Sequence, residues 1–544
     1  MNRRTVTAAA VTLALATAWL IAQQQAQTTK ALPDLIPPGA LLTLEARDAN
    51  ALITSWNASP EKKTWVSSSA YQTYIRSKLA LRLDEVQNQY ATGLGVSPDL
   101  ALLENIAGGD AAVAVYDIGK LEMLYLTRLP QARAADNLLT RARTKFQQRN
   151  AAGQSYYTKA TTDGTVAFAI VGDLLVLATR EDLVANSLTL LRNGGTSLRQ
   201  ERWYTDAAAA AVSQNAPDVR LTVHMERTVR TPHFRSYWIQ QNITDLKAYT
   251  ATVSDLYFGQ ADVTEKRTLV RAEPQTVEAN TQLAALLPYL PSDAGFTQSW
   301  ARPQAAVVQY LIRQQIAPQL QASGAAPQLY APGETQEQQA GDEGDLEQRI
   351  DTEQPVLLQN GVRQLPIVQL GSTAPVVAAA KVAASRTLAD GVFTGIDSAV
   401  VLLRGQGDWD RNSIDRALRD SGVEPSGLEP VHVLIDGKIL ALSNSKPLLD
   451  RIAAKRGNTA AAAAPGVTHT AVYRHATENA QYARLMRMLD FPKLPTTTPR
   501  PPMLFSETIA SIGDVLGRVE TVTMETKDEG NVVRQSVVYQ RKRS

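Results

Sequence analysis

A pattern of strand, turn, strand and helix occurs twice in this chain, and the repetition limits the folds that the chain can adopt. Residues 165–183 contain two apolar runs around a Gly172-Asp173 turn, followed by a helix start. Residues 431–443 align with this pattern without a gap, at an offset of 265 residues. The nineteen-residue block contains six identities, at positions 166/431, 170/435, 172/437, 175/440, 177/442 and 183/448. The sequence therefore predicts an internal duplication.

The segments around the two blocks recur in the same order. The predicted equivalences are 32–37 with 287–291, 111–116 with 398–403, 131–146 with 408–420, and 219–225 with 468–473. We therefore expect a leader over residues 1–30, a first repeat over 31–273, a linker at 274–285 and a second repeat over 286–544. A chain of 544 residues exceeds the usual size of one hydrophobic core, which also favours more than one domain.

Short apolar runs joined by tight turns predict an α+β fold, with mostly antiparallel sheets and helices packed on one face. Helical periodicity is expected over 65–90, 131–146 and 237–246, and we expect Asp48 and Thr179 to be N-caps. In the first repeat Ala167, Ala169 and Val171 make one strand face apolar. The corresponding face of the second repeat reads His432, Leu434 and Asp436, so it is more polar.

Two insertions distinguish the second repeat from the first. Residues 331–353 contain eight acidic residues, one arginine and no aromatic residue, a composition typical of disordered segments. Such a tract could also bind a cation or a partner. Residues 491–502 are rich in proline, which favours an extended loop.

The composition excludes several classes of function. The chain has no cysteine, so disulfides, thiolate metal sites, cysteine nucleophiles and lipoprotein acylation are absent. The chain has 55 Lys and Arg residues and 53 Asp and Glu residues. Without Arg3 and Arg4 of the leader, the numbers of basic and acidic residues are equal. Nucleic-acid binders usually carry a basic excess, and we therefore expect no nucleic-acid partner.

The N-terminus predicts export. Arg3 and Arg4 precede an uncharged apolar stretch over residues 5–22, and a polar spacer follows at 23–30. This arrangement is typical of a signal peptide, with Ala16-Thr17-Ala18 as a small-residue cleavage pattern, or of a single membrane anchor. Arginines on the cytoplasmic side place the body of the chain outside the cytoplasm. The expected location is the periplasm, or the inner membrane with the body outside the cytoplasm.

No local motif predicts a catalytic centre, a cofactor or a metal. The five histidines form neither an HxxxH nor an HExxH arrangement. The run from Asp408 begins like a calcium loop, but Ser413 and Arg419 occupy the positions that require glycine and glutamate. Nucleophile-elbow, P-loop and GxGxxG patterns are absent. Aromatic residues gather near 203–204, 233–238 and 249–258; they are interpreted as core packing or as a contact patch.

Four runs resemble a group of exported bacterial envelope proteins that is catalogued only as a domain of unknown function. The runs lie at residues 38–47 (PGALLTLEAR), 56–62 (WNASPEK), 111–120 (AAVAVYDIGK) and 172–180 (GDLLVLATR). The resemblance implies a bacterial source and export, and it carries no catalytic residue.

These observations favour a non-enzymatic exported envelope protein, a duplicated scaffold that binds a protein partner or an apolar ligand. The alternative is an envelope hydrolase whose acid and base residues converge only in the fold. The candidate binding face is the one that carries His432 and Asp436, because there the second repeat departs from the apolar pattern of the first.

Overall fold

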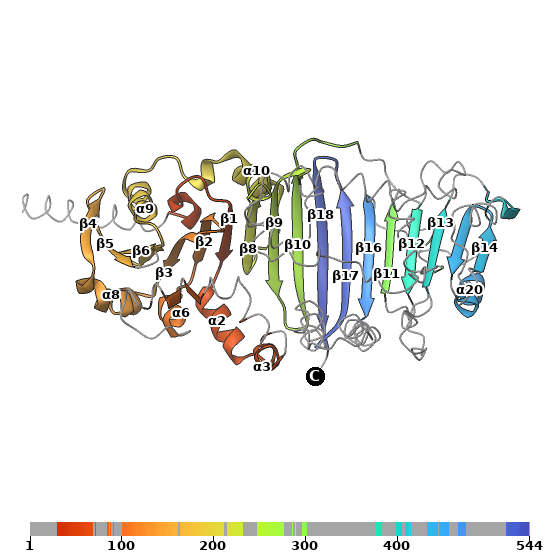
Figure 1. Cartoon of the computed structure of the whole chain (residues 1–544), viewed down its shortest axis with the longest axis horizontal. Helices are drawn as coiled ribbons and strands as arrows, with labels where there is room; N and C mark the ends of the chain where they lie inside the picture. Colours follow the sequence, from red (N-terminus) through yellow and green to blue (C-terminus); the bar gives the residue numbers. More distant parts are fainter. Residues whose placement is uncertain are drawn as a thin grey trace, which may run out of the picture. The chain divides into compact units, whose positions relative to one another are not determined.

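The structure is a computed structural model of the whole chain (Figure 1). It describes residues 30–68, 101–161, 164–211, 215–231, 247–276, 296–301, 376–381, 399–404, 408–412, 432–443, 445–455, 466–474 and 518–542. A few single positions between 71 and 91, and residues 286, 289 and 414, are also described. The chain divides into two compact units: Met1–Gly259 with Thr264–Pro274 and Asn531–Val533, and Gln275–Gly530 with Gln260–Val263 and Arg534–Ser544.

The first unit is built around one antiparallel sheet. Its strands are β1 (Leu42–Ala46), β2 (Ala111–Asp117), β3 (Glu122–Arg128), β4 (Gln147–Ala151), β5 (Gln154–Thr161), β6 (Gly164–Val171), β7 (Leu174–Ala178), β8 (Val219–His224), β9 (Tyr249–Phe258) and β10 (Asp262–Arg271). The pairings give the order β4-β5-β6-β7-β3-β2-β1-β8-β9, and β9 also pairs with β10. Strands β1 and β2 are thus neighbours although 64 residues separate them.

Helical segments connect these strands. They are η1 (Leu32–Leu35), α2 (Ala49–Ala58), α3 (Pro60–Ser67), α6 (Ala101–Ile106), α7 (Gln131–Ala135), α8 (Leu138–Ala142), η2 (Arg143–Lys145), α9 (Glu181–Asn193), η3 (Leu198–Gln200), α10 (Arg202–Ala210) and α11 (Met225–Thr228). The predicted cap of the first helix is confirmed, because the Asp48 side chain accepts a hydrogen bond from the Ala51 N–H at 2.8 Å. Ser59 ends α2 and caps α3.

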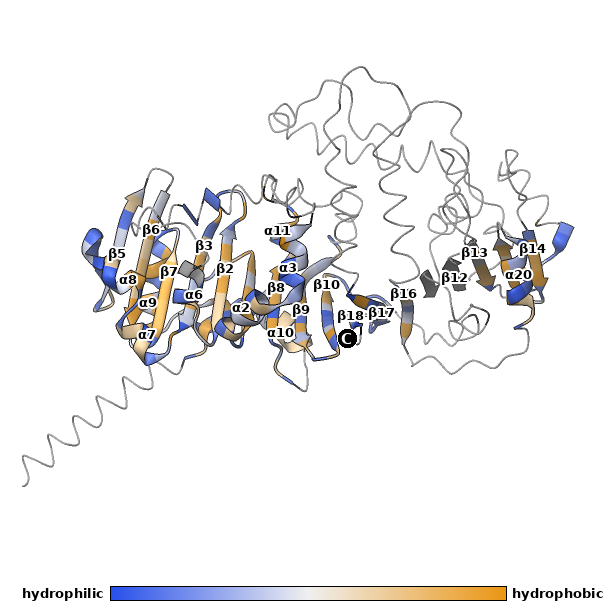
Figure 2. Cartoon of the chain, turned by 90° about the horizontal axis from the view of Figure 1, so that it is seen from below, coloured by the Kyte–Doolittle hydropathy of each residue, from blue (hydrophilic) through white to orange (hydrophobic). Residues whose placement is uncertain are grey.

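Helices cover both faces of the sheet at β6 and β7. Strand β7 is accordingly coloured as hydrophobic in Figure 2. On one face Ala167, Ala169 and Val176 pack with Val184 and Leu188 of α9. On the other face, side chains of β6 and β7 such as Phe168 pack with residues of α6 and α8. The α+β class with antiparallel sheets is confirmed, and the helical cover extends beyond the single face that we expected.

The second unit repeats this arrangement in part. Its elements are β11 (Phe296–Ala301), β12 (Val376–Lys381), β13 (Ala399–Arg404), β14 (His432–Asp436), β15 (Ile439–Ser443), α20 (Lys446–Ala453), β16 (Val467–Arg474), β17 (Val519–Asp528) and β18 (Val532–Arg541). The antiparallel order β14-β15-β13-β12-β11-β16-β17 matches the order β6-β7-β3-β2-β1-β8-β9 of the first unit. Helix α20 packs on β13, β14 and β15, as α9 packs on β6 and β7.

The register of one hairpin also corresponds between the two units. Ala167 lies opposite Ala178 in the first unit, and His432 lies opposite Ser443 in the second, 265 residues later in each case. Both hairpins turn at a glycine with a positive φ, 62° at Gly172 and 53° at Gly437, which glycine adopts without a steric cost.

One predicted equivalence was wrong. We matched residues 398–403 with 111–116, but β13 pairs with β15 in the same way as β3 pairs with β7. Strand β13 is therefore the counterpart of β3, and β12 is the counterpart of β2. Short apolar strands resemble one another, and only their hydrogen-bonded neighbours distinguish them.

Two local predictions were also wrong. The helix expected over 131–146 is broken at Asp136, since the Asn137 side chain caps a new helix by accepting from the Thr140 N–H. The N-cap of α9 is Arg180 and not Thr179. The Thr179 hydroxyl instead accepts a hydrogen bond from the Met123 N–H at 2.8 Å, which ties β7 to β3.

Several predictions concern residues outside the described ranges. These are the leader, the helix expected over 237–246, most of the helix expected over 65–90, the acidic tract 331–353 and the proline-rich loop 491–502. In the part of the chain that the structure describes, no helix has both the length and the apolar composition that a membrane crossing requires.

We predict that Phe168→Ala destabilises the first unit strongly. Phe168 is 1% exposed and contacts the rings of Phe146 and Tyr157, with centroids 5.1 and 5.3 Å away. Removing a buried aromatic ring costs about 3–5 kcal/mol of unfolding free energy. Chemical denaturation measures the change, with the exposed Val66→Ala as control. An equal effect of the two substitutions would show that this core does not hold the sheet.

Candidate functional site

The predicted binding face, with His432 and Asp436, lies on β14 beneath α20. Both residues are half-buried, and they lie opposite Ser443 and Ile439 of β15. Leu434, between them, packs against the hydrophobic cluster of this unit, to which α20 contributes Leu448, Leu449 and Ile452. Four residues along a strand span about 13 Å, so the structure does not bring the histidine and the carboxylate together. The assignment of this face as a binding site stays a prediction.

The described histidines do not form a metal site. No group of three or more His, Cys, Asp or Glu residues comes together among the described residues. His224 is buried at the end of β8, where its Nδ1 accepts from the Arg227 N–H and its ring lies 4.7 Å from the ring of Trp203. Burial is the largest cause that lowers the pKa of His224, so the neutral imidazole is favoured.

A row of charged residues crosses three strands beneath α10. Glu45 of β1 lies opposite Arg220 of β8, which lies opposite Asp255 of β9. Residues that pair across antiparallel strands point to the same face, so these three side chains are brought together by register alone. The sequence analysis missed them. The available local signal was one charged residue within each short strand, as in the LTLEA run of β1.

Each member of this polar row has a partner. The Arg220 guanidinium donates to both carboxylate oxygens of Asp255, at 2.6 and 2.7 Å. The Tyr204 hydroxyl, from α10, donates to Glu45 at 2.7 Å. The side chain of Asp255 is only 3% exposed, whereas that of Arg220 is 23% exposed. The ion pair is therefore largely shielded from water and is sensitive to the loss of either partner.

Burial is the main cause of the pKa shifts of Glu45 and Tyr204. Burial raises the pKa of Glu45 above its usual value of 4.5, although the hydrogen bond from Tyr204 and the charge of Arg220 act in the opposite direction. Burial and the neighbouring Glu45 carboxylate raise the pKa of the Tyr204 hydroxyl. A carboxyl group with a raised pKa is what a general acid needs. The Glu45 carboxyl group, however, already accepts a hydrogen bond from Tyr204, and α10 covers it.

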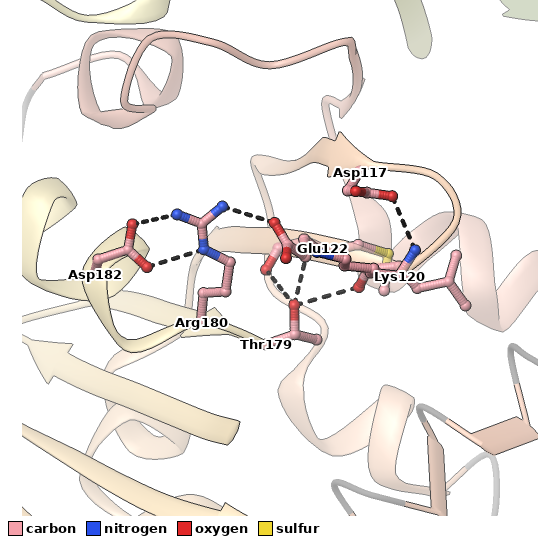
Figure 3. A network of polar contacts seen from close by, with 8 residues as sticks. Asp117, Lys120, Glu122, Thr179, Arg180 and Asp182 are labelled. Atoms are coloured by element: carbon pink, nitrogen blue, oxygen red, sulfur yellow. Dashed lines mark hydrogen bonds and ion pairs between the residues drawn. The ribbon is translucent and has the colours of Figure 1, made fainter. Parts of the chain in front are cut away.

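A second polar network joins β3 to the start of α9 (Figure 3). Arg180 donates to both oxygens of Asp182, at 3.0 and 2.6 Å, and to Glu122 at 2.7 Å. The Asp117 carboxylate accepts from the Lys120 N–H within the preceding turn. These side chains are partly exposed and paired with one another, so the network fixes the β3, β7 and α9 junction.

An apolar face lies on the side of β1, β2 and β8 that is remote from α10. Two cross-strand rows form it: Val115, Leu42 and Val223, and Val113, Leu44 and Leu221. Leu44 is 42% exposed and the other five residues are half-buried. Neither of the two hydrophobic clusters described above for this unit includes them. We call these six residues the β1 apolar face.

Comparisons with known proteins give no family. No family model matches the chain, and no curated protein matches it. Crystal form I of TP0453 aligns over 46% of this chain and 82% of its own, with 12% identity and a TM-score of 0.24. Crystal form III aligns over 47% and 84%, with 12% identity and a TM-score of 0.25. TM-scores of this size establish neither a shared fold nor a shared function.

We predict that removing one member of the Arg220–Asp255 pair destabilises the protein more than removing both. Asp255→Leu alone strands a shielded guanidinium and is expected to cost about 3–5 kcal/mol of unfolding free energy. Arg220→Met combined with Asp255→Leu is expected to recover most of that loss, since no unpaired charge remains. Denaturant titration of the single and double variants measures both values. A double variant as unstable as the sum of the singles would contradict this account.

The raised pKa of Glu45 predicts a pH-dependent stability. The folded state holds the proton more tightly than the unfolded state, so the stabilising contribution is full below pH 4.5 and declines as the pH rises toward the raised pKa. Glu45→Gln keeps an acceptor for Tyr204 and cannot ionise. Its unfolding free energy relative to the wild type should therefore increase as the pH rises above about 4.5. Parallel pH profiles of the two proteins would refute the assignment.

Proposed function

We propose that this chain is a non-enzymatic exported protein of a bacterial envelope, a duplicated scaffold that binds a protein partner or an apolar ligand. The observation that carries the proposal is the β1 apolar face, where Leu44 is 42% exposed at the middle of a sheet. Exposed apolar residues scattered singly are ordinary, whereas a contiguous set on neighbouring strands is typical of a contact surface. The leader of the sequence and its resemblance to exported envelope proteins support the location.

The matching strand order of the two units supports the duplication. Seven neighbouring strands have the same pairing order and the same antiparallel direction in both units, and the register of the β6–β7 hairpin recurs in β14–β15. A tandem copy frees one unit to diverge. The half-buried His432 and Asp436 face marks such a divergence on the strand where the first unit carries alanine and valine.

The polar row beneath α10 is the one observation that bears on the hydrolase alternative. Glu45 and Asp255 lie on the same sheet face, on either side of Arg220. Arg220 neutralises Asp255, and Tyr204 hydrogen-bonds Glu45, so both carboxylates already have the partners that a buried charge requires. This arrangement favours a role in stability, and the scaffold is the better supported function.

We predict that Leu44→Glu weakens binding at the β1 apolar face. The substitution places a charge among five apolar neighbours, so an apolar ligand would have to desolvate it. The measurement is a titration of the purified full chain with N-phenyl-1-naphthylamine, a neutral fluorescent apolar probe. We expect the affinity to fall roughly tenfold, which corresponds to about 1.4 kcal/mol. The control is Asn186→Glu, at an exposed position of α9 on the opposite side of the sheet.

A photocrosslinking residue at position 44 tests the protein-partner arm in the native envelope, with position 186 as control. An adduct of defined mass that forms from position 44 alone would identify a partner at this face. Unchanged probe binding by Leu44→Glu, together with no adduct specific to position 44, would reject the proposed surface.

A further inference from the structure

Strand β4 is the outer strand of the first unit's sheet and is unusually open. It pairs with β5 and with no other strand among the described residues. Residues 147–150 are exposed on both faces, so no described helix buries these four residues from above or below. Natural edge strands are blocked by proline, by a bulge, by a covering element, by shortness or by charged side chains. Strand β4 contains no proline, and its register with β5 is regular; its protection is limited to its length of five residues and the charge of Arg149.

The hairpin geometry shows which backbone groups face outward. Ala152 and Gly153 form a two-residue turn with φ values of 49° and 78°, as a type I′ turn requires. In such a hairpin the closing pair, Ala151 and Gln154, is hydrogen-bonded, and the bonded pairs alternate along the strand. Arg149 and Gln147 therefore bond to β5, while Gln148 and Asn150 direct their N–H and C=O groups outward.

These outward groups are available for pairing. No backbone or side-chain group in the described part of the chain bonds to the main-chain N–H or C=O of Gln148 or Asn150. Two donors and two acceptors alternate along the edge, which matches the pattern of an added antiparallel strand. Recognition of an extended peptide by an open sheet edge obtains its affinity from such main-chain bonds.

The charge near this edge selects the kind of strand that would fit. Residues 137–161 contain five basic residues and no acidic one: Arg141, Arg143, Lys145, Arg149 and Lys159. Arg141 is paired with Asp136. Arg143 and Arg149 form no ion pair with the described residues, and Arg149 lies on β4 itself.

One carboxylate from another element lies near these basic residues. Glu181 of α9 accepts hydrogen bonds from Tyr156 and Thr158 of β5, the strand that pairs with β4. It offsets one of the remaining basic residues, and the net positive field that is left attracts carboxylates and repels a basic segment.

The same arginine disfavours self-association through this edge. Two copies of β4 could pair antiparallel, with Gln148 of each copy opposite Asn150 of the other. Arg149 of one copy would then lie opposite Arg149 of the other. Like charges directly opposite each other on neighbouring strands are destabilising. A second copy is thus a poorer occupant than an acidic strand.

We propose that the outer edge of β4 binds an acidic extended segment of another protein, which joins the sheet as an additional strand. The main-chain groups of Gln148 and Asn150 hold its backbone, and Arg149 with Arg143 favours its carboxylates. This surface is separate from the β1 apolar face, so it is a second interaction surface on the first unit.

The decisive variant is Gln148→Pro in the full chain. Proline removes the outward N–H while leaving the bonds of Arg149 and Gln147 to β5 in place, and edge strands tolerate proline at such positions. Gln148→Ala is the matched control, because it alters the side chain and keeps the N–H. The probe is a fluorescein-labelled heptapeptide that alternates glutamate with valine or threonine, followed by fluorescence anisotropy. A peptide with lysine in place of glutamate tests the charge.

We expect Gln148→Pro to weaken binding of the acidic peptide roughly tenfold, and Gln148→Ala to change it less than about twofold. Arg149→Glu should weaken binding and reduce its dependence on salt, whereas Arg202→Glu, at an exposed position of α10, should not. If Gln148→Pro unfolds, methylation of alternate peptide nitrogens tests the same bonds on the wild-type chain. Equal binding of the acidic and lysine peptides, or full affinity after proline substitution or N-methylation, would overturn the proposal.

Discussion

Burial of β6 and β7 on both faces is the constraint on which the first unit depends. A strand that is apolar on alternate positions needs cover on one side, but these two strands are apolar at nearly every position. Helix α9 with η1 meets one face, and α6 with α8 meets the other. The tight turn at Gly172 keeps the two strands in register, and a slip by one residue would exchange all of their neighbours.

The sheet of the first unit becomes more polar with distance from β6 and β7. Toward β8 and β9 the helical cover comes from α10 and the short α11, and the inward positions carry Glu45, Arg220 and Asp255. At the other end, β4 carries exposed polar side chains on both faces. The surfaces proposed for binding lie where the cover of the central strands ends: on the outer face of β1 and at the edge of β4.

The two units share the same strand pairing but carry different side chains on equivalent strands. The face of β6 that packs under α9 carries alanine and valine, whereas the equivalent face of β14 carries His432 and Asp436 around a packed Leu434. Helix α20 covers β14 with fewer buried residues than α9 uses on β6 and β7. The two units therefore share this backbone pairing while the side chains on their equivalent strands differ.

The sequence alone determined the strand–turn–strand–helix blocks, because alternating apolar runs, a turn glycine and a helix start are local signals. It also determined the cap at Asp48 and the α+β class. The tertiary structure decided the rest, for reasons of register. The equivalence of β13 with β3 is visible only from its neighbours, and β4 has no apolar pattern by which it could be predicted. Glu45, Arg220 and Asp255 are 175 and 35 residues apart along the chain, and only the pairing of β1, β8 and β9 brings them into one row.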